Sequence, residues 1–471
     1  MRALLLGVLV ATGCQGHGSR PPAPDAPPPD APPDPRRTYI KASNTSASST
    51  FGQSVALSAD GTRLAVGSDL GEQLGLVYIF ARTGETWVQE AILQSQGTAR
   101  DDFGRCVALS DDGAILAVGA PGDSSAANEP TDTSLPGAGA VFVFTRSGTA
   151  WSRTAYLKAS NRDQIDSFGG AIALSGDATT LAVGATGEDS AAAGIDGNQL
   201  DNSRTSAGAV YVFGRSGASW TQQSYVKASN PGAPDHFGAA IALSRDGSTL
   251  AIAAPDESSN SAGIDGDQSD DSLSSAGAAY VFARSGATWL QQAYVKPTNP
   301  DANDQFGGSL ALSRDGNLFA ASAPFERSGV PGDPTDNSQL QAGAVYVFTR
   351  ASATWSQAAY VKTTPASQSL FGTALALSDD GTQLVAGAVE DNNFVGAAYL
   401  FAGSGAAWSQ QHLVTASNGQ AGDDFGVRLA LSADGATLAI GAEGEDSAAT
   451  GIDGDQSDNS AESAGAVYVF R

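Results

Sequence analysis

The apolar positions of the chain form short segments that recur in one fixed order. A Phe-Gly pair opens each repeat and precedes an Ala-Leu-Ser segment or a close relative of it. A Ser-x-Asp turn follows, then a segment such as Leu-Ala-Val-Gly-Ala, a polar loop, a segment such as Gly-Ala-Val-Tyr-Val-Phe, and a last segment such as Tyr-Val-Lys-Ala-Ser-Asn. Short apolar runs separated by turn residues predict strands, here four per repeat, which we call a, b, c and d. The Phe-Gly pair recurs at Phe51, Phe103, Phe168, Phe237, Phe306, Phe371 and Phe425.

The strand c segments are apolar on both faces instead of alternating with polar residues. A strand reads this way when both faces of its sheet are covered, as happens when blades stack face to face around an axis. Seven four-stranded units therefore predict an all-β fold, a seven-bladed β-propeller with antiparallel blades. A linear solenoid would need distinctive polar caps at its ends, and the sequence has none.

The two ends of the repeat region indicate how the ring closes. The last repeat stops after its strand c, at Phe470, and has no strand d. The first repeat is preceded by a d-like segment, Tyr39–Asn44, without a unit of its own. We therefore expect residues 38–44 to pair with Gly465–Phe470 and to supply the missing outer strand of the last blade.

The repeat resembles a known family. The Phe-Gly pair, the Val118–Pro121 segment (Val-Gly-Ala-Pro) and the Val-Tyr-Val-Phe type of strand c look like FG-GAP repeats, which build the propeller of integrin α subunits and of many bacterial surface proteins. In that family the calcium-binding blades carry Asp-x-Asp-x-Asp-Gly in the a–b turn. Here the turn is shorter, as in Ser58–Gly61, and one carboxylate cannot supply the six to eight oxygens that calcium needs. The family's calcium site is therefore not expected in these turns.

The first 37 residues are typical of an export signal followed by a tether. Arg2, an apolar run and the small residues before Cys14 are typical of a secretory signal and resemble a bacterial lipoprotein signal. The resemblance implies a signal peptide over 1–13 and a lipid anchor on Cys14; the alternative is an ordinary signal peptide with an incidental Cys. A Pro-rich tether over 14–37 and the propeller over 38–471 would follow. The expected location is an exported, membrane-anchored lipoprotein of the outer membrane or cell surface.

Charge and residue inventory exclude several functions. The chain has 50 acidic and 25 basic residues, a net charge of −25, which argues against nucleic acid as a partner. His236 and His412 are too few for a zinc site, and no Gly-x-Ser-x-Gly motif is present. Cys106 lies in an apolar strand and is interpreted as a core residue. We therefore predict no catalytic residues and a protein that is not an enzyme.

The lysines share one repeat position, in strand d, where we interpret them as guards against edge-to-edge strand pairing. A lysine that recurs in this way does not suit a catalytic role, which would need a single special residue. The five are Lys41, Lys158, Lys227, Lys296 and Lys362.

Acidic residues concentrate in the long b–c loops. Strand direction alternates within a blade, so the a–b and c–d turns lie on one face of the disc and the b–c and d–a loops on the other. Three b–c loops share an Asp-x-[Asp/Asn]-x-x-Asp pattern that predicts a calcium site, because calcium prefers oxygen ligands; the alternative is that Asp and Asn only form turns and add solubility. The candidate ligands are Asp196, Asn198, Asp201, Asp265, Asp267, Asp270, Asp453, Asp455 and Asp458.

These observations lead to one functional hypothesis with two alternatives. The hypothesis is a membrane-tethered, extracytoplasmic, non-enzymatic binding or adhesion scaffold that presents an acidic loop face to a protein or glycan, with calcium as the one candidate cofactor and membrane contact only through the lipid anchor. The first alternative is a propeller hydrolase or lyase with a site at the central pocket. The second is a purely structural coat or spacer protein.

Overall fold

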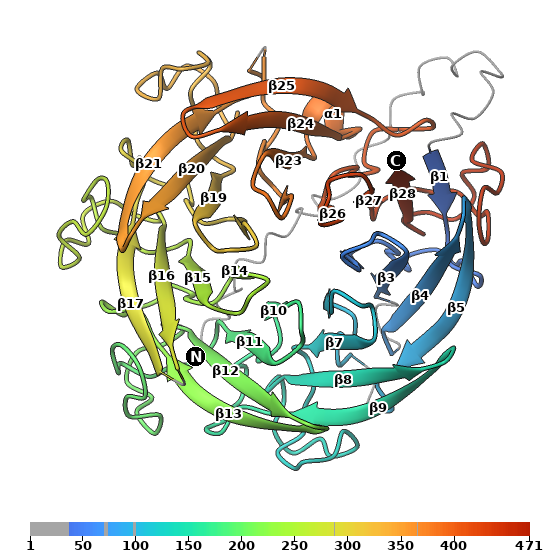
Figure 1. Ribbon diagram of the computed structural model, residues 1–471, viewed down its shortest axis with the longest axis horizontal. Coiled ribbons are helices and arrows are strands. Elements are labelled where there is room, and N and C mark those ends of the chain that lie inside the picture. Colours follow the sequence, from blue (N-terminus) through green and yellow to red (C-terminus); the bar gives the residue numbers. More distant parts are fainter. Residues whose placement is uncertain (1–36, 70–73, 98–99, 287, 365) are drawn as a thin grey trace, which may run out of the picture. The chain divides into compact units, whose positions relative to one another are not determined.

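A computed structural model describes residues 37–69, 74–97, 100–286, 288–364 and 366–471. Within this part of the chain, 28 strands form seven separate four-stranded antiparallel sheets, and the one helical segment is α1 (Asp391–Phe394). The sheets are the blades of a ring, with strand a of each blade innermost and strand d outermost (Figure 1). The predicted seven-bladed propeller is thus confirmed. No helix among the described residues has the length and apolar character required to span a membrane.

The blades follow one another along the chain, with strands in the order a to d from the axis outward. Blade 1 is β2 (Ser54–Leu57), β3 (Arg63–Ser68), β4 (Leu76–Thr83) and β5 (Thr86–Gln94); blade 2 is β6 (Cys106–Leu109), β7 (Ile115–Ala120), β8 (Ala140–Ser147) and β9 (Ala150–Leu157). Blade 3 is β10 (Ile172–Leu174), β11 (Thr180–Ala185), β12 (Ala209–Ser216) and β13 (Ser219–Val226); blade 4 is β14 (Ile241–Leu243), β15 (Thr249–Ala254), β16 (Ala278–Ser285) and β17 (Thr288–Val295). Blade 5 is β18 (Leu310–Leu312), β19 (Leu318–Ala323), β20 (Ala344–Ala351) and β21 (Thr354–Val361); blade 6 is β22 (Leu375–Leu377), β23 (Gln383–Ala388), β24 (Ala397–Ser404) and β25 (Ala407–Val414). Blade 7 is β26 (Arg428–Leu431), β27 (Leu438–Ala442), β28 (Ala466–Phe470) and β1 (Arg37–Ile40).

The N-terminal strand closes the ring. Strand β1 pairs antiparallel with β28, with Tyr39 opposite Tyr468 and Ile40 opposite Val467. The backbone N–H of Lys41 also donates to the carbonyl of Gly451, at 2.8 Å. The predicted pairing of the first strand with the last strand c is therefore confirmed.

The Phe of each Phe-Gly pair packs against strand c of its own blade, and the Gly lets its backbone lie close to strand c of the preceding blade. In blade 3, the Phe168 ring lies edge-on to the rings of Tyr211 and Phe213, with centroids 5.4 and 6.0 Å apart. Gly169 has a φ of +94°, and a Cβ there would lie 2.4 Å from the carbonyl oxygen of Ala140. A side chain is therefore excluded at this position, which explains why the dipeptide recurs.

The interpretation of the lysines as edge guards is wrong. Each lysine side chain is at most 2% exposed and forms an ion pair of 2.7–2.9 Å with a carboxylate that follows strand b of the same blade. Burial lowers the pKa of Lys227, and the charge of Glu188 opposes that shift. The pairs are Lys41–Glu445, Lys158–Asp123, Lys227–Glu188, Lys296–Glu257 and Lys362–Glu326.

The rest of the strand d motif serves the same carboxylates. Glu257 accepts hydrogen bonds from the Tyr294 hydroxyl and Lys296 of its own blade, and from the Asn230 amide, which ends strand d of the preceding blade. The Asn230 oxygen in turn accepts from the Tyr280 hydroxyl. The Tyr-x-Lys-x-x-Asn motif therefore joins neighbouring blades through a buried polar network.

Candidate functional site

In blades 3, 4 and 7, the b–c loop pairs with the last residues of strand d at its outer edge. Isolated bridges join Ile195 to Val226 and Ile264 to Val295, and Ile452 pairs with Ile40 in the same way. Figure 1 shows these loops at the periphery of the ring. In these three blades the loop supplies backbone partners at the end of strand d, so the lysines are not needed to protect that part of the edge.

The first residue of each predicted calcium pattern holds this loop in place. One carboxylate oxygen of Asp196 accepts from the backbone N–H of Tyr225 at 2.9 Å, and the Asp196 N–H donates to the Tyr225 carbonyl at 2.7 Å. Asp265 does the same with Tyr294, and Asp453 with Tyr39. These three aspartates therefore clasp the loop to strand d.

The other six predicted ligands form local turns. In the middle position, Asp267 accepts from the backbone N–H and the hydroxyl of Ser269. In the last position, Asp201 accepts from the N–H groups of Ser203 and Ala191. Such bonds are the usual Asx-turn contacts. The remaining four behave alike: Asn198 with Leu200, Asp270 with Ser272, Asp455 with Ser457 and Asp458 with Ser460.

The structure does not test the predictions of a calcium site and of a lipid anchor. Among the described residues, no group of three or more His, Cys, Asp and Glu side chains is placed to hold a metal ion. The structure gives the nine loop residues structural bonds, and calcium binding by these loops stays a prediction. Cys14 lies outside the described residues.

The histidines and the cysteine of the propeller are not grouped into a site. Nδ1 of His236 lies 2.7 Å from Asp256, whereas His412 is exposed on β25. The Cys106 thiol donates to the carbonyl of Gly169, and burial raises its pKa to about 12. A thiol that keeps its proton is a poor nucleophile, in agreement with its interpretation as a core residue.

Apolar side chains rise from the acidic loops. Leu200 is 87% exposed, Leu340 62% and Phe394 50%, each in a b–c loop of a different blade. Ile165, in a d–a loop of the same face, is 70% exposed. Each of these side chains stands singly on its loop, and each would bury apolar area if a partner covered it.

On the opposite face, every a–b turn is built alike. In Ser378–Gly381, the serine hydroxyl donates to Asp380, which also accepts from the N–H of Thr382. The hydroxyl oxygen of Ser378 accepts from the N–H of Gln383. The hydrogen bond from Ser378, first among several, lowers the pKa of Asp380. The Ser and the Asp of the Ser-x-Asp pattern are thus both explained by turn geometry.

The variable residue x of each turn lies at the propeller axis. Backbone N–H groups of successive turns donate to the carbonyl of the x residue in the next blade, at 2.9–3.3 Å, and the seventh turn donates back to the first. Seven peptide hydrogen bonds therefore join the turns in a closed ring. Its carbonyls belong to Asp111, Gly176, Arg245, Arg314, Asp379, Ala433 and Ala59.

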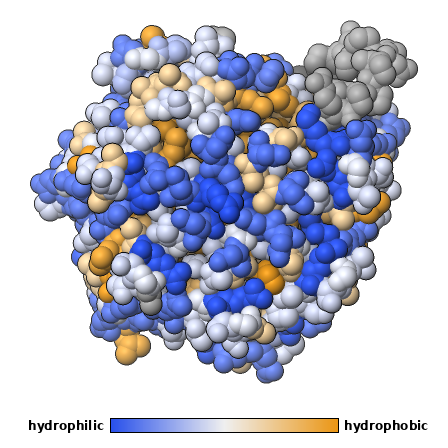
Figure 2. Space-filling model, viewed as in Figure 1, coloured by the Kyte–Doolittle hydropathy of each residue, from blue (hydrophilic) through white to orange (hydrophobic). Residues whose placement is uncertain are grey.

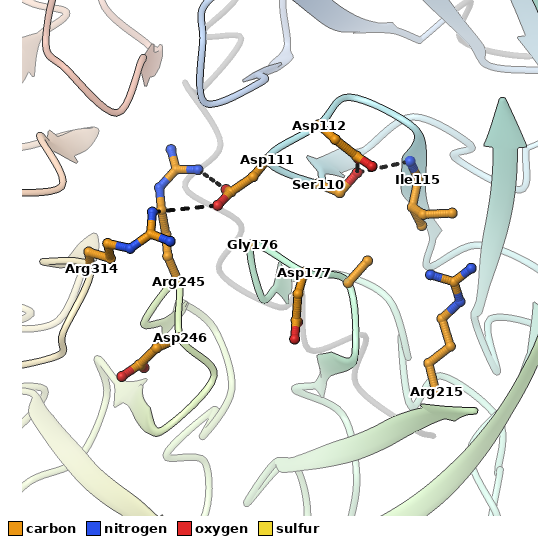
Figure 3. A pocket seen from close by; sticks show the side chains of 11 residues that line it. Ser110, Asp111, Asp112, Ile115, Gly176, Asp177, Arg215, Arg245, Asp246 and Arg314 are labelled. Carbon is orange, nitrogen blue, oxygen red and sulfur yellow. Dashed lines mark hydrogen bonds and ion pairs between the residues drawn. The ribbon is translucent and has the colours of Figure 1, made fainter. Parts of the chain in front are cut away.

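Four charged side chains converge from this ring. The Arg245 guanidinium forms an ion pair with Asp111 (Figure 3). It forms a second ion pair with Asp379, at 2.5 Å. Arg314 lies 2.9 Å from Asp379 and 3.7 Å from Asp111. Gly176 makes room for this arrangement, since a Cβ there would lie 2.3 Å from a carboxylate oxygen of Asp111. The axis thus carries two opposite pairs of charges. Polar residues also dominate the surface on this side of the molecule (Figure 2).

A pocket of about 460 Å³ lies beside these charges. It is lined by the a–b turns of blades 2 to 5, by Ile115 and by Arg215 of β12 (Figure 3). Sequence reasoning missed this site because it treated x as a spacer. The signal in the sequence was that x changes from Ala to Asp, Gly and Arg while the flanking Ser and Asp stay constant.

A second set of carboxylates is buried between blades, two residues before the Phe of the Phe-Gly pair. Burial, reinforced by Glu326 and Asp301, raises the pKa of Asp304 to about 8. Burial also raises the pKa of Asp166 and Asp423 to about 7 and that of Asp101 and Asp235 to about 6. These groups titrate near neutral pH and bear on stability.

Two solved structures have folds similar to that of this chain. A chain of a mitotic checkpoint complex crystal structure has 13% sequence identity and a TM-score of 0.50, covering 96% of this chain and 99% of the other. A chain of Kuenenia stuttgartiensis hydrazine synthase has 12% identity and a TM-score of 0.51, covering 85% and 95%. At these identities the likeness concerns the fold alone. No curated protein matches significantly.

The FG-GAP repeat model matches residues 87–144, 151–213, 220–282 and 408–470. Each match runs from the Trp of one c–d hairpin into strand c of the next blade. Together the matches cover just over half of the chain. The chain therefore belongs to the FG-GAP repeat family.

Proposed function

We propose that the protein is a non-enzymatic binding scaffold that presents its b–c and d–a loop face to a protein or glycan outside the cytoplasm. The observation that carries the proposal is the set of exposed apolar tips, Leu200, Leu340, Phe394 and Ile165, on loops rich in acidic residues. When a partner covers apolar side chains exposed to this degree, the removal of their surface from water makes binding more favourable.

The loops that bear these tips are held before any partner arrives. The clasp of Asp196 on Tyr225 and the turns of Asn198 and Asp201 fix the blade 3 loop beneath Leu200. A preorganised loop loses less conformational entropy on binding than a free one does. In blade 7, residues 441–470 contain seven acidic residues and no basic one, which favours a partner with positive charge.

The experiment compares capture by tip variants with capture by a matched control. The full chain carrying Cys14→Ser is immobilised and exposed to an envelope extract, with Leu200→Ser, Leu340→Ser and Phe394→Ser combined in one variant. The control combines Leu290→Ser and Leu413→Ser, two tips of similar exposure on strand d (59% and 53%). We expect the loop variant to lose its specific partner and the control to keep it. Equal capture by both would argue against the loop face.

Tethering through Cys14 is part of the same proposal, supported by the signal-like N-terminus. Cells expressing the chain should hold it in the membrane fraction, and Cys14→Ser should release it or block its processing. If both forms are equally soluble after export, the anchor is wrong and the scaffold acts as a secreted protein.

A further inference from the structure

The pocket beside the axis contains a guanidinium without a partner. Arg215 extends toward Ile115 in Figure 3, and it makes no side-chain hydrogen bond or ion pair with any residue that the structure describes. Three of the equivalent arginines are engaged by the preceding blade, whereas Arg82 of blade 1 lies over the Trp87 ring of its own blade. Arg146 pairs with Glu90, Arg284 bonds to Thr180 and Gln223, and Arg350 bonds to Gln292.

The sequence of blade 2 explains why Arg215 differs. In the three blades that engage the next arginine, the acceptor three residues after the strand d Trp is Glu90, Gln223 or Gln292, whereas blade 2 has Thr154 there. Thr154 is short, and its hydroxyl is shared with Thr145. The second acceptor position, Thr180 in blade 3, is Ile115 in blade 2. Both acceptors that would hydrogen-bond the guanidinium are therefore missing.

The other positive charges of the pocket are already paired. Arg245 and Arg314 are neutralised by Asp111 and Asp379. A half-buried guanidinium without a carboxylate gains most from an anionic ligand, because charge-assisted hydrogen bonds are strong and the fork of Arg matches a carboxylate. The free positive charge in the pocket is thus that of Arg215.

Opposite this charge lie carboxylates with accepting capacity left. All hydrogen bonds that the structure gives Asp177 fall on Oδ1, from Ser175 and Thr179, so that Oδ2 keeps its accepting capacity. Burial alone would raise the pKa of Asp177, but hydrogen bonds from Thr179 and Ser175 lower it, so the group is ionised at neutral pH. Asp112 likewise uses only Oδ1, toward Ser110 and Ala114. Ionised carboxylates of this kind accept from hydroxyl groups.

We propose that this pocket binds a sugar acid, whose carboxylate pairs with Arg215 and whose hydroxyls donate to Asp177 and Asp112. Ile115 and Ala178 supply a small apolar wall for the C–H face of the ring. The volume of about 460 Å³ lies in the range of small-molecule sites. The site is on the turn face and is independent of the loop face proposed above.

The test uses glucuronate as the probe, with glucose and acetate as comparison ligands, on the full chain by isothermal titration calorimetry. Glucuronate should bind more tightly than either, because glucose lacks the carboxylate and acetate lacks the hydroxyls. Arg215→Gln should weaken glucuronate binding by about 10- to 100-fold, the loss expected for a charged hydrogen bond. Arg284→Gln, at the same repeat position in blade 4, is the matched control and should bind as the wild type.

A second variant changes the pocket without removing its charge. Thr154→Gln restores the acceptor that other blades have, so it should capture Arg215 and weaken glucuronate binding several-fold while the protein stays folded. The proposal is overturned if glucuronate does not bind, if acetate or glucose binds equally well, or if Arg215→Gln binds glucuronate as the wild type does.

Discussion

Removing the amine from a buried Lys–Glu pair leaves a carboxylate without its counter-charge where water has little access. Each of the five pairs is almost completely buried, and the carboxylate also organises a tyrosine hydroxyl and a loop N–H. A buried charge that loses its partner is costly, whereas replacing both partners is often close to neutral. The paired lysines are therefore structural residues whose effect depends on both partners.

Lys227→Met should lower the stability of the propeller by about 3–5 kcal/mol, the cost typical of breaking a buried pair. The double variant Lys227→Met with Glu188→Gln should recover more than half of this loss, because no uncompensated charge is left in the core, although the single amide oxygen can accept only from Tyr225 or from Ser190. Chemical denaturation of the three proteins measures both effects. A single variant as stable as the wild type would mean that Glu188 is not held as an ion.

The buried aspartates before the Phe-Gly pairs should make stability depend on pH. Asp304 has a pKa of about 8 in the folded protein against an ordinary value of 3.8, so between these values the folded state keeps a proton that the unfolded state releases. Stability therefore falls as pH rises through this window, by ~1.4 kcal/mol for each unit of pKa difference.

Asp304→Asn should flatten the rise in melting temperature seen on going from pH 8.5 to pH 4.5. The control Asp380→Asn changes an exposed turn aspartate, so it should leave the slope over this range unchanged while lowering stability at every pH. A wild-type protein that is more stable at pH 8 than at pH 5 would contradict the burial of these carboxylates.

At the scale of elements, the Asp-x-[Asp/Asn]-x-x-Asp pattern of the b–c loops can hold the loop through protein hydrogen bonds alone or through a bound calcium ion. The clasp of Asp265 on Tyr294 and the turn of Asp267 with Ser269 hold the loop by protein bonds alone. Calcium would add to them only by recruiting further oxygens. The loops of blades 3, 4 and 7 are the place to measure this, since they share the pattern.

Calcium binding predicts a rise in melting temperature with millimolar calcium relative to chelator. With a dissociation constant of ~10⁻⁴ M, each site would add about 1.4 kcal/mol at millimolar calcium. Magnesium is the control for charge screening, and Asp267→Ala with Asp455→Ala should remove the contributions of the blade 4 and blade 7 loops and leave that of blade 3. Equal shifts with both ions, or none, would leave the loops as clasps and turns.

Ring closure is an element-scale property that hydrogen exchange can test. The amides of Ile40 and Lys41 should exchange as slowly as those of β28, because β1 pairs with this strand and Lys41 bonds to Gly451. Fast exchange at these two amides, with slow exchange at Val467, would show a frayed strand and an open ring.

For the whole molecule, the period of the sequence predicts the architecture and the closing strand, because strand c burial and the Phe-Gly approach repeat in every blade. Side-chain roles are harder to predict. The position of the lysines in strand d suggests an exposed edge, because their partners Glu188 and Glu257 lie 39 residues earlier and meet them only once the blade has folded. The axial charges escape prediction because Asp111, Arg245 and Asp379 meet only when the ring closes.

The central claim is that partners bind to the b–c and d–a loops and not to the turn face or the outer strands. Hydrogen exchange of the captured complex against the free protein tests it directly, since both faces are read in one experiment. The account predicts slower exchange around Leu200, Leu340 and Phe394, with no change in the Ser-x-Asp turns such as Ser378–Gly381. Slower exchange confined to the turns or to β5, β17 and β25 would contradict it.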